Sequence, residues 1–228
     1  MIFGLLTTAL VILCLNEIDG MKQIVPKIKK EWVNEIVLVD GGSTDGSLEE
    51  AKKLGLKIIN QKIKGHGAAI LAGVNATKSD NIVFFGPDGN HEPEEIPLLI
   101  AEMAKKNVDQ IMCSRFAPES INLDAGAIDT FGNKMFAFLA NTFFGGNWTD
   151  VLNESRIITR KAWNELNFDA MKFDSTYQMS IRGMKLKQKM AEIVGNEGAR
   201  IGGERKIQSF GTGCVLLKRF FIELFKKV

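Results

Sequence analysis

Short runs of mostly apolar residues alternate with amphipathic stretches along the first half of the chain. The runs are typical of buried strands, which we expect at residues 9–15, 36–40, 57–60, 82–85 and 109–113. The stretches between them predict helices at residues 20–30, 47–54, 67–77 and 94–106. This alternation predicts an α/β fold with a mostly parallel central sheet and helices on both faces. Right-handed crossovers then place the loops that follow the strands along one edge.

The second half of the chain has a different pattern. A long apolar segment, residues 130–144, shows helical spacing and ends at two glycines, Gly145 and Gly146. A strand is expected at residues 156–159 and a helix at residues 175–184. We expect this half to supply loops to the face of the sheet where the earlier loops gather.

The final segment, residues 211–228, is amphipathic, and we expect residues 1–210 before it to form one domain without repeats or linkers. Its apolar positions recur at helical spacing and its basic residues accompany them: Leu216, Leu217, Phe220, Phe221, Leu224 and Phe225, with Lys218, Arg219, Lys226 and Lys227. Such a helix lies in a membrane interface or packs on its own domain, and the pattern leaves both open.

Composition narrows the class of protein. The 228 residues are 45% hydrophobic and 25% charged, which is ordinary for one well-buried domain. A net charge of +2 argues against nucleic acid as a partner. Three widely spaced cysteines predict neither disulfides nor a zinc site, and they favour a cytoplasmic location, at the inner face of a membrane if the last helix binds lipid. The apolar residues 1–15 are too short to span a bilayer and lack a basic leader.

A turn directly follows the apolar run at residues 82–85, and it holds an acidic side chain. Its sequence is Gly-Pro-Asp-Gly-Asn-His, from Gly86 to His91. Ligands of open α/β sheets bind at the carboxyl ends of the strands, where this turn must lie. Asp88 and Asn90 are two residues apart, so their side-chain oxygens can reach one Mg²⁺ or Mn²⁺ ion. The alternative is a plain turn between a strand and a helix.

Two glycine-rich segments lie at other strand ends. Asp40 closes the second run and precedes two glycines, so its carboxylate can accept hydrogen bonds from a base or a ribose. Lys64 and Gly65 open a predicted helix, whose free N–H groups attract anions. Neither an ATP-type phosphate loop nor a dinucleotide-binding fingerprint is present.

Basic residues are expected on the same side. Arg115 ends the strand at 109–113, where a guanidinium can hold a diphosphate with two parallel hydrogen bonds or form a structural ion pair. Arg200 and Lys206 belong to a glycine-rich basic stretch that suits a loop closing over phosphates, unless it is simply a solvated run of charges.

In their order and spacing these motifs resemble the family 2 glycosyltransferases of the GT-A fold, close to the dolichyl-phosphate mannosyltransferase type. The resemblance runs from about residue 9 to residue 206. It implies that Asn16 and Glu17 contact the nucleotide and that Asp40 binds the base. Asp88 falls on the second aspartate of the family's Asp-x-Asp segment.

The resemblance also implies a phosphate-binding set: Lys64 and Gly65 at the helix start, Arg115 after its strand, and Arg200 with Lys206 in the basic loop. The chain departs from the family at Gly86, which stands where the first aspartate of Asp-x-Asp would be. Asp88 is then the only acidic metal ligand in that motif, supplemented by Asn90, and we expect weak metal binding in the absence of the donor.

The implied reaction is metal-assisted sugar transfer from a nucleotide-diphosphate donor, with Asp88 and Arg115 stabilising the leaving diphosphate. A polyprenyl-phosphate acceptor needs no general base, whereas a glycan hydroxyl needs a carboxylate to take its proton. Asp150, Glu154 and Asp174 are the candidates, and Asp150 has an alternative role in capping a helix or turn, because Asp is a favoured capping residue. Two other functions stay open: a nucleotide-sugar binding module without turnover, and a nucleotidyltransferase.

Overall fold

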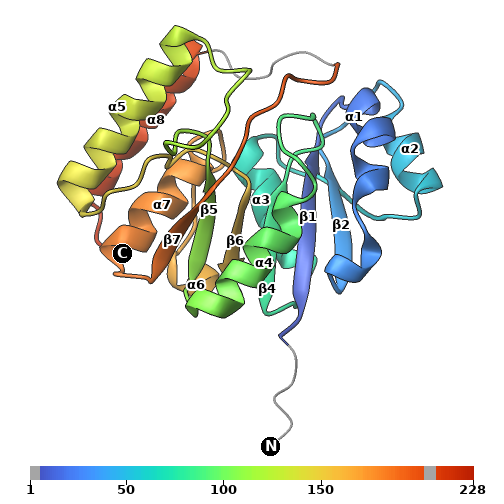
Figure 1. Ribbon diagram of the computed structural model, residues 1–228, viewed down its shortest axis with the longest axis horizontal. Coiled ribbons are helices and arrows are strands. Elements are labelled where there is room, and N and C mark those ends of the chain that lie inside the picture. Colours follow the sequence, from blue (N-terminus) through green and yellow to red (C-terminus); the bar gives the residue numbers. More distant parts are fainter. Residues whose placement is uncertain (1–5, 203–208) are drawn as a thin grey trace, which may run out of the picture.

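The computed structural model describes residues 6–202 and 209–228, which contain one seven-stranded sheet with the strand order β3-β2-β1-β4-β6-β5-β7. The strands are β1 (Thr8–Cys14), β2 (Glu35–Asp40), β3 (Lys57–Asn60), β4 (Asn81–Phe85), β5 (Gln110–Ser114), β6 (Arg156–Thr159) and β7 (Met190–Val194). The helices are α1 (Ile18–Gln23), α2 (Ser47–Lys53), α3 (His66–Asn75), α4 (Glu95–Lys106), α5 (Ala127–Phe144), α6 (Arg160–Glu165), α7 (Ser175–Lys185) and α8 (Ser209–Phe225). Figure 1 shows the sheet between its covering helices.

The sheet is mostly parallel, as predicted, but β6 runs against both of its neighbours. β6 lies between β4 and β5 and brings its amino-terminal end to the edge where the other strands finish. The direction of β6 was not predicted, because the sequence of a four-residue strand does not show whether it pairs parallel or antiparallel with its neighbours. β7 and α6 were also missed; β7 is a half-buried strand at the end of the sheet without a continuous apolar run.

Side chains of β1 alternate between two cores, since successive residues of a strand point to opposite faces. Leu10 and Ile12 belong to a cluster with α1, α2 and α4, and Val11 and Leu13 belong to a second cluster with α3, α6 and α7. The predicted helix at residues 20–30 is shorter than expected. The α-helical part, α1, stops at Gln23. Two short 3-10 helices follow it, and the first of them contains Pro26.

A third cluster joins α5 and α8 to α7 (Figure 1). Leu216 and Phe220 of α8 are buried in it, so this helix packs on its own protein. The charged residues Arg219 and Glu223 also point inward, where Arg219 pairs with Asp174 (2.7 Å) and Glu223 with Arg182 (2.8 Å).

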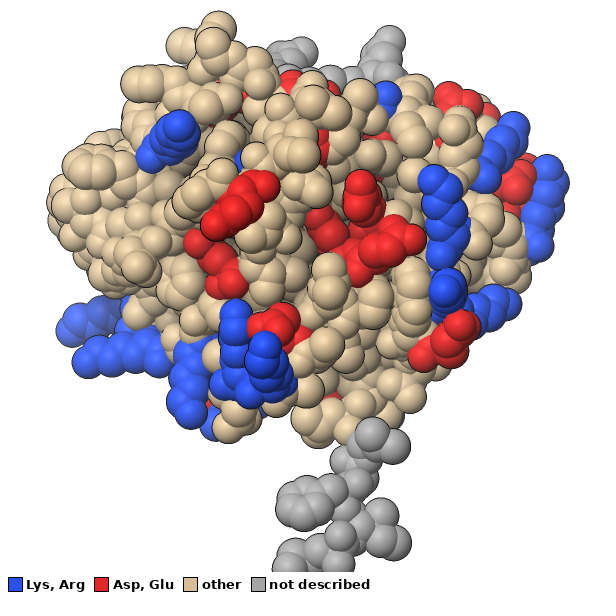
Figure 2. All heavy atoms as spheres, in the orientation of Figure 1, with Lys and Arg blue, Asp and Glu red and all other residues tan. Residues whose placement is uncertain are grey.

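The outward face of the same helix pair is apolar. Large side chains are exposed along it: Ile128, Phe131, Phe138 and Phe143 of α5, and Phe210, Leu217, Phe221, Ile222 and Phe225 of α8. In Figure 2 the surface over α5, at the upper left, shows few charged side chains, whereas Lys and Arg gather below it near the C-terminal end. Within the described ranges, no helix combines the length and apolarity needed to cross a bilayer.

Candidate active site

A cavity of about 1080 Å³ opens at the carboxyl edge of the sheet. The segments that follow the six strands β1, β2, β3, β4, β5 and β7 contribute to its wall, together with the segment that precedes β6. The loops therefore gather along one edge, as the strand–helix alternation predicted. Ile128, Phe131, Phe210 and Leu217 extend the wall onto α5 and α8, so the polar end of the cavity continues into the apolar helix pair.

The Asp88 turn is held in place from two sides. The backbone carbonyl of Asp88 accepts a hydrogen bond from the Ile201 N–H (2.8 Å), and the carbonyl of Asn90 accepts one from the Gly198 N–H (2.8 Å). On the other side α1 packs against the turn through Gly20, where a side chain would collide with the Pro87 carbonyl. The turn is thus fixed by contacts with elements distant in the sequence.

Arg200 joins two of the predicted site carboxylates. Its guanidinium lies 2.7 Å from Asp88 Oδ2 and 3.3 Å from Glu17 Oε1. All three side chains line the cavity. The structure therefore brings Glu17, Asp88 and Arg200 together, whereas Lys206 lies outside the described residues.

Asn90 has an orphaned oxygen at the cavity wall. The residue is 7% exposed, and its Nδ2 donates to Asp124 Oδ2 at 3.2 Å, while its Oδ1 has no hydrogen-bond partner among the described residues. A buried acceptor without a partner is costly, and an amide oxygen is a good ligand for a hard cation. Asp88 and Asn90 therefore fit Mg²⁺ or Mn²⁺ in kind. No set of three or more His, Cys, Asp or Glu side chains in residues 6–202 and 209–228 is arranged to hold a metal, so further ligand oxygens must complete such a site.

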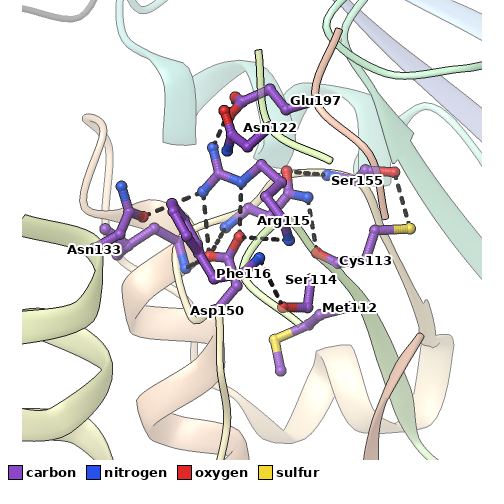
Figure 3. A network of polar contacts seen from close by, with 12 residues as sticks. Met112, Cys113, Ser114, Arg115, Phe116, Asn122, Asn133, Asp150, Ser155 and Glu197 are labelled. Atoms are coloured by element: carbon purple, nitrogen blue, oxygen red, sulfur yellow. Dashed lines mark hydrogen bonds and ion pairs between the residues drawn. The ribbon is translucent and has the colours of Figure 1, made fainter. Parts of the chain in front are cut away.

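Arg115 and Asp150 form a two-point ion pair (Figure 3), with Nε 2.7 Å from Oδ2 and Nη2 3.2 Å from Oδ1. Arg115 also contacts Glu197 Oε1 at 3.1 Å. Burial would raise the pKa of the Asp150 carboxyl, but the Arg115 guanidinium and the N–H groups of Leu152 and Arg115 hold it below its usual range. Arg115 was predicted to hold the diphosphate and Asp150 to act as a general base. In the structure the two side chains bind each other instead.

Glu154 was the second candidate base, and among the three carboxylates it alone lines the cavity. Its Oε2 lies 2.5 Å from His66 Nε2, and His66 Nδ1 lies 2.7 Å from Ser175 Oγ. Burial opposes ionisation of Glu154, but the hydrogen bond with His66 and nearby positive charges lower its pKa. Asp174, the third candidate, is held by Arg219 of α8.

The predicted nucleotide-binding residues mainly build the loops around the cavity. Asn16 Oδ1 accepts the Thr44 N–H (2.8 Å), and the buried Asp40 accepts the N–H groups of Gly42 (3.0 Å) and Ser43 (3.1 Å). Asp40 thus shapes the loop whose glycines reach the cavity wall.

At the helix start, Lys64 and Gly65 line the cavity. Gly65 has a φ of 128°, and a Cβ there would lie 2.2 Å from the Met171 carbonyl oxygen, so glycine is required.

His66, Asp124 and Glu197 also line the cavity, and sequence reasoning did not assign them to the site. His66 lies between two glycines at a helix start, which was a usable signal. Asp124 and Glu197 lie in irregular loops, and Glu197 follows the strand that the sequence pattern did not reveal.

Comparison with known proteins gives a consistent result. A family model described as glycosyl transferase family 2 matches residues 9–166. The low-salt glycan biosynthesis hexosyltransferase Agl6 of Haloferax volcanii is 26% identical over 217 residues, which cover 91% of this chain and 51% of that protein. The dodecaprenyl-phosphate galacturonate synthase of Rhizobium johnstonii is 29% identical over 119 residues, covering 47% of this chain and 35% of that protein. The chain thus spans about half the length of the Haloferax relative.

The fold is similar to that of glucosyl-3-phosphoglycerate synthase from Mycobacterium tuberculosis, a structure solved with Mn²⁺, UDP and phosphoglyceric acid. The TM-score is 0.76 at 20% identity, and the match covers 98% of this chain and 80% of that one. The same enzyme has also been solved with Mg²⁺ and UDP. This likeness confirms the predicted α/β fold of the GT-A type.

Proposed function

The chain belongs to glycosyl transferase family 2, and on this premise we propose that it transfers a sugar from a nucleoside-diphosphate donor to an acceptor. The observation that carries the proposal is the arrangement of Asp88, Asn90 and Arg200 at the carboxyl edge of the sheet. One guanidinium, one carboxylate and one unpaired amide oxygen meet there in a cavity large enough for a nucleotide sugar.

The donor diphosphate is bound by the cation-rich side of this arrangement. Arg200 is the guanidinium nearest to Asp88, and a diphosphate oxygen that replaces one of its carboxylate partners gains a charge-assisted hydrogen bond. Lys64 lies on the same cavity wall, whereas the expected helix-start donors are already used, because the N–H groups of Gly67 and Ala68 donate to the carbonyls of Lys172 and Met171 (3.2 Å each). Arg115 and Asp150 act as positioning residues, because their mutual ion pair ties the loop after β5 to the loop before β6.

Asp88 and Asn90 would hold a Mg²⁺ or Mn²⁺ ion. A bound ion of this kind neutralises the charge that grows on the leaving diphosphate. Both residues lie within the turn that Ile201 and Gly198 fix by backbone hydrogen bonds, so their oxygens are preorganised. Arg200 supplies further positive charge beside them.

A polyprenyl phosphate is the acceptor that the geometry favours. The cavity continues from the polar turn onto Ile128 and Phe131 of α5 and Phe210 and Leu217 of α8, which suits an isoprenoid chain. A relative is named as a dodecaprenyl-phosphate galacturonate synthase. An acceptor phosphate is already an anion and needs no general base. The exposed apolar face of α5 and α8 would bring the protein to the membrane that contains such a lipid.

Transfer to a lipid acceptor is tested with a panel of UDP- and GDP-sugars, Mn²⁺ and a short polyprenyl phosphate, and lipid-linked sugar is measured by mass spectrometry. Asp88→Ala should abolish transfer, whereas Glu49→Ala, on the exposed side of α2, should leave it unchanged. Donor binding without transfer to lipid or glycan would favour the alternative of a binding module. No binding of any nucleotide sugar would refute the proposed function.

A further inference from the structure

Gly86 and Glu154 share one small volume beside Asp88. An ideal Cβ on Gly86 would lie 2.4 Å from Glu154 Oε1 and 3.8 Å from Asp88 Oδ1. Real Cβ atoms essentially never come within 3.0 Å of such an atom, so any side chain at position 86 would displace the Glu154 carboxylate from its present position. The carboxylate of Glu154 therefore fills the space that a residue-86 side chain would enter.

The sheet explains why these two residues meet. β4 and β6 pair antiparallel, with Asn81 opposite Thr159 and Phe84 opposite Arg156. Two residues beyond the last of these pairs, the same register places Gly86 opposite Glu154. Opposite residues of an antiparallel pair present their side chains on the same face, about 5 Å apart. A carboxylate at position 86 and a carboxylate at position 154 can therefore reach the same volume beside Asp88.

The second oxygen of Glu154 fixes its orientation. Oε2 is bonded to His66 Nε2, which leaves Oε1 on the side of Gly86 and Asp88. His66 is in turn fixed by Ser175 Oγ and by stacking on Phe173, with ring centroids 5.3 Å apart. This is how second partners commonly orient a metal-binding carboxylate.

We propose that Glu154 supplies, from the β6 side, the second carboxylate of the Asp88 site, so that Asp88, Asn90 and Glu154 together hold the divalent ion that binds with the donor diphosphate. The assignment rests on the proposed function and gives Glu154 a role other than general base. The buried Oδ1 of Asn90, which accepts no hydrogen bond from the described residues, independently marks this wall of the cavity as a place for a cation. Two carboxylates and a neutral oxygen leave the remaining positions of the ion to diphosphate and water oxygens.

The test exchanges the carboxylate between the two strands. Calorimetry measures UDP and GDP binding with and without Mn²⁺ for the unmodified chain, Glu154→Gln, Gly86→Asp, and the double variant Gly86→Asp/Glu154→Gly. Asp88→Asn is the reference for loss of one carboxylate. Thermal melting checks that each variant is folded.

Glu154→Gln should weaken Mn²⁺-dependent nucleotide binding about 10- to 100-fold and leave metal-free binding unchanged. The double variant should recover binding to within a few fold, because Asp at 86 then has the space that Glu154 vacates. Gly86→Asp alone should not improve binding, since the two side chains collide.

Two results overturn the assignment while leaving the proposed function intact. One is unchanged Mn²⁺-dependent binding in Glu154→Gln with reduced turnover, which identifies a general base instead. The other is a folded double variant without recovery. If the unmodified chain binds neither nucleotide in the presence of Mn²⁺, the proposed function fails and the assignment fails with it.

Discussion

Gly20 tests whether the position of the Asp88 turn controls the reaction. It lies in α1 without a positive φ, so its backbone does not require glycine. An ideal Cβ at this position would lie 1.7 Å from the Pro87 carbonyl oxygen and 3.5 Å from Asp88 Cα. Judged by helix propensity alone, Gly20→Ala would stabilise the protein by up to about 1 kcal/mol. Judged by packing, it must displace the turn.

The steric effect should prevail. Real Cβ atoms essentially never approach closer than 3.0 Å, so the Pro87 carbonyl and α1 must separate by at least about 1.3 Å from the present 1.7 Å contact. The colliding atom is backbone and cannot rotate away. Overpacking of this kind costs about 1–3 kcal/mol, which offsets the gain in propensity and leaves a net loss of up to about 2 kcal/mol. A displacement of about 1 Å at reacting groups can lower the rate about 100-fold.

The assay combines urea unfolding with kcat/KM for sugar transfer. Gly20→Ala should lower the free energy of unfolding by up to about 2 kcal/mol and kcat/KM by about 100-fold. The matched control is Gly211→Ala in α8, where a Cβ meets none of the described residues within 4 Å and stability should stay level or rise slightly. Unaltered stability and kcat/KM in Gly20→Ala would refute the argument that α1 positions the turn.

Three further predictions concern charge, lipid and pH. Arg200→Ala should weaken nucleoside-diphosphate binding about 10- to 100-fold in calorimetry, with partial recovery in Arg200→Lys; equal affinity would contradict the assigned contact. Phe221→Ser with Phe225→Ser should reduce cosedimentation with anionic vesicles and change the free energy of unfolding by less than about 0.5 kcal/mol, because both side chains are exposed; undiminished cosedimentation would exclude this face. Burial opposes ionisation of Glu223, but Arg182 and other partners lower its pKa, so its stabilising effect is present above its usual pKa of 4.5 and is lost as the pH falls through the lower folded value. Glu223→Gln should therefore cost about 3–5 kcal/mol at pH 7 in urea unfolding, with a smaller difference below pH 4.5, and a constant difference would contradict the ion pair.

The central part of the fold was predictable because its signals are local. The apolar run at 82–85 and the proline and glycines after it define β4 and its turn without reference to other segments. β6 and β7 depend on partners instead. Their place and direction in the sheet are fixed by pairing with β4 and β5, which no short pattern records.

The site shows the same division. Asp88 and Asn90 were placed correctly at a strand end, since parallel strands finish at one edge. The partners of Arg115 were not predictable, because Asp150 is 35 residues away in sequence and reaches it only through the folded loops. The mutual exclusion of Gly86 and Glu154 depends on an antiparallel register and is visible only in three dimensions.

The inward orientation of Arg219 and Glu223 has a consequence for handling the protein in solution. Since the charges of Arg219 and Glu223 are neutralised inside the fold, the aromatic outer face of α8 is displayed permanently and requires no triggering event. In a buffer free of detergent, two molecules can cover that face only by meeting each other, so light scattering should detect concentration-dependent self-association that mild detergent reverses.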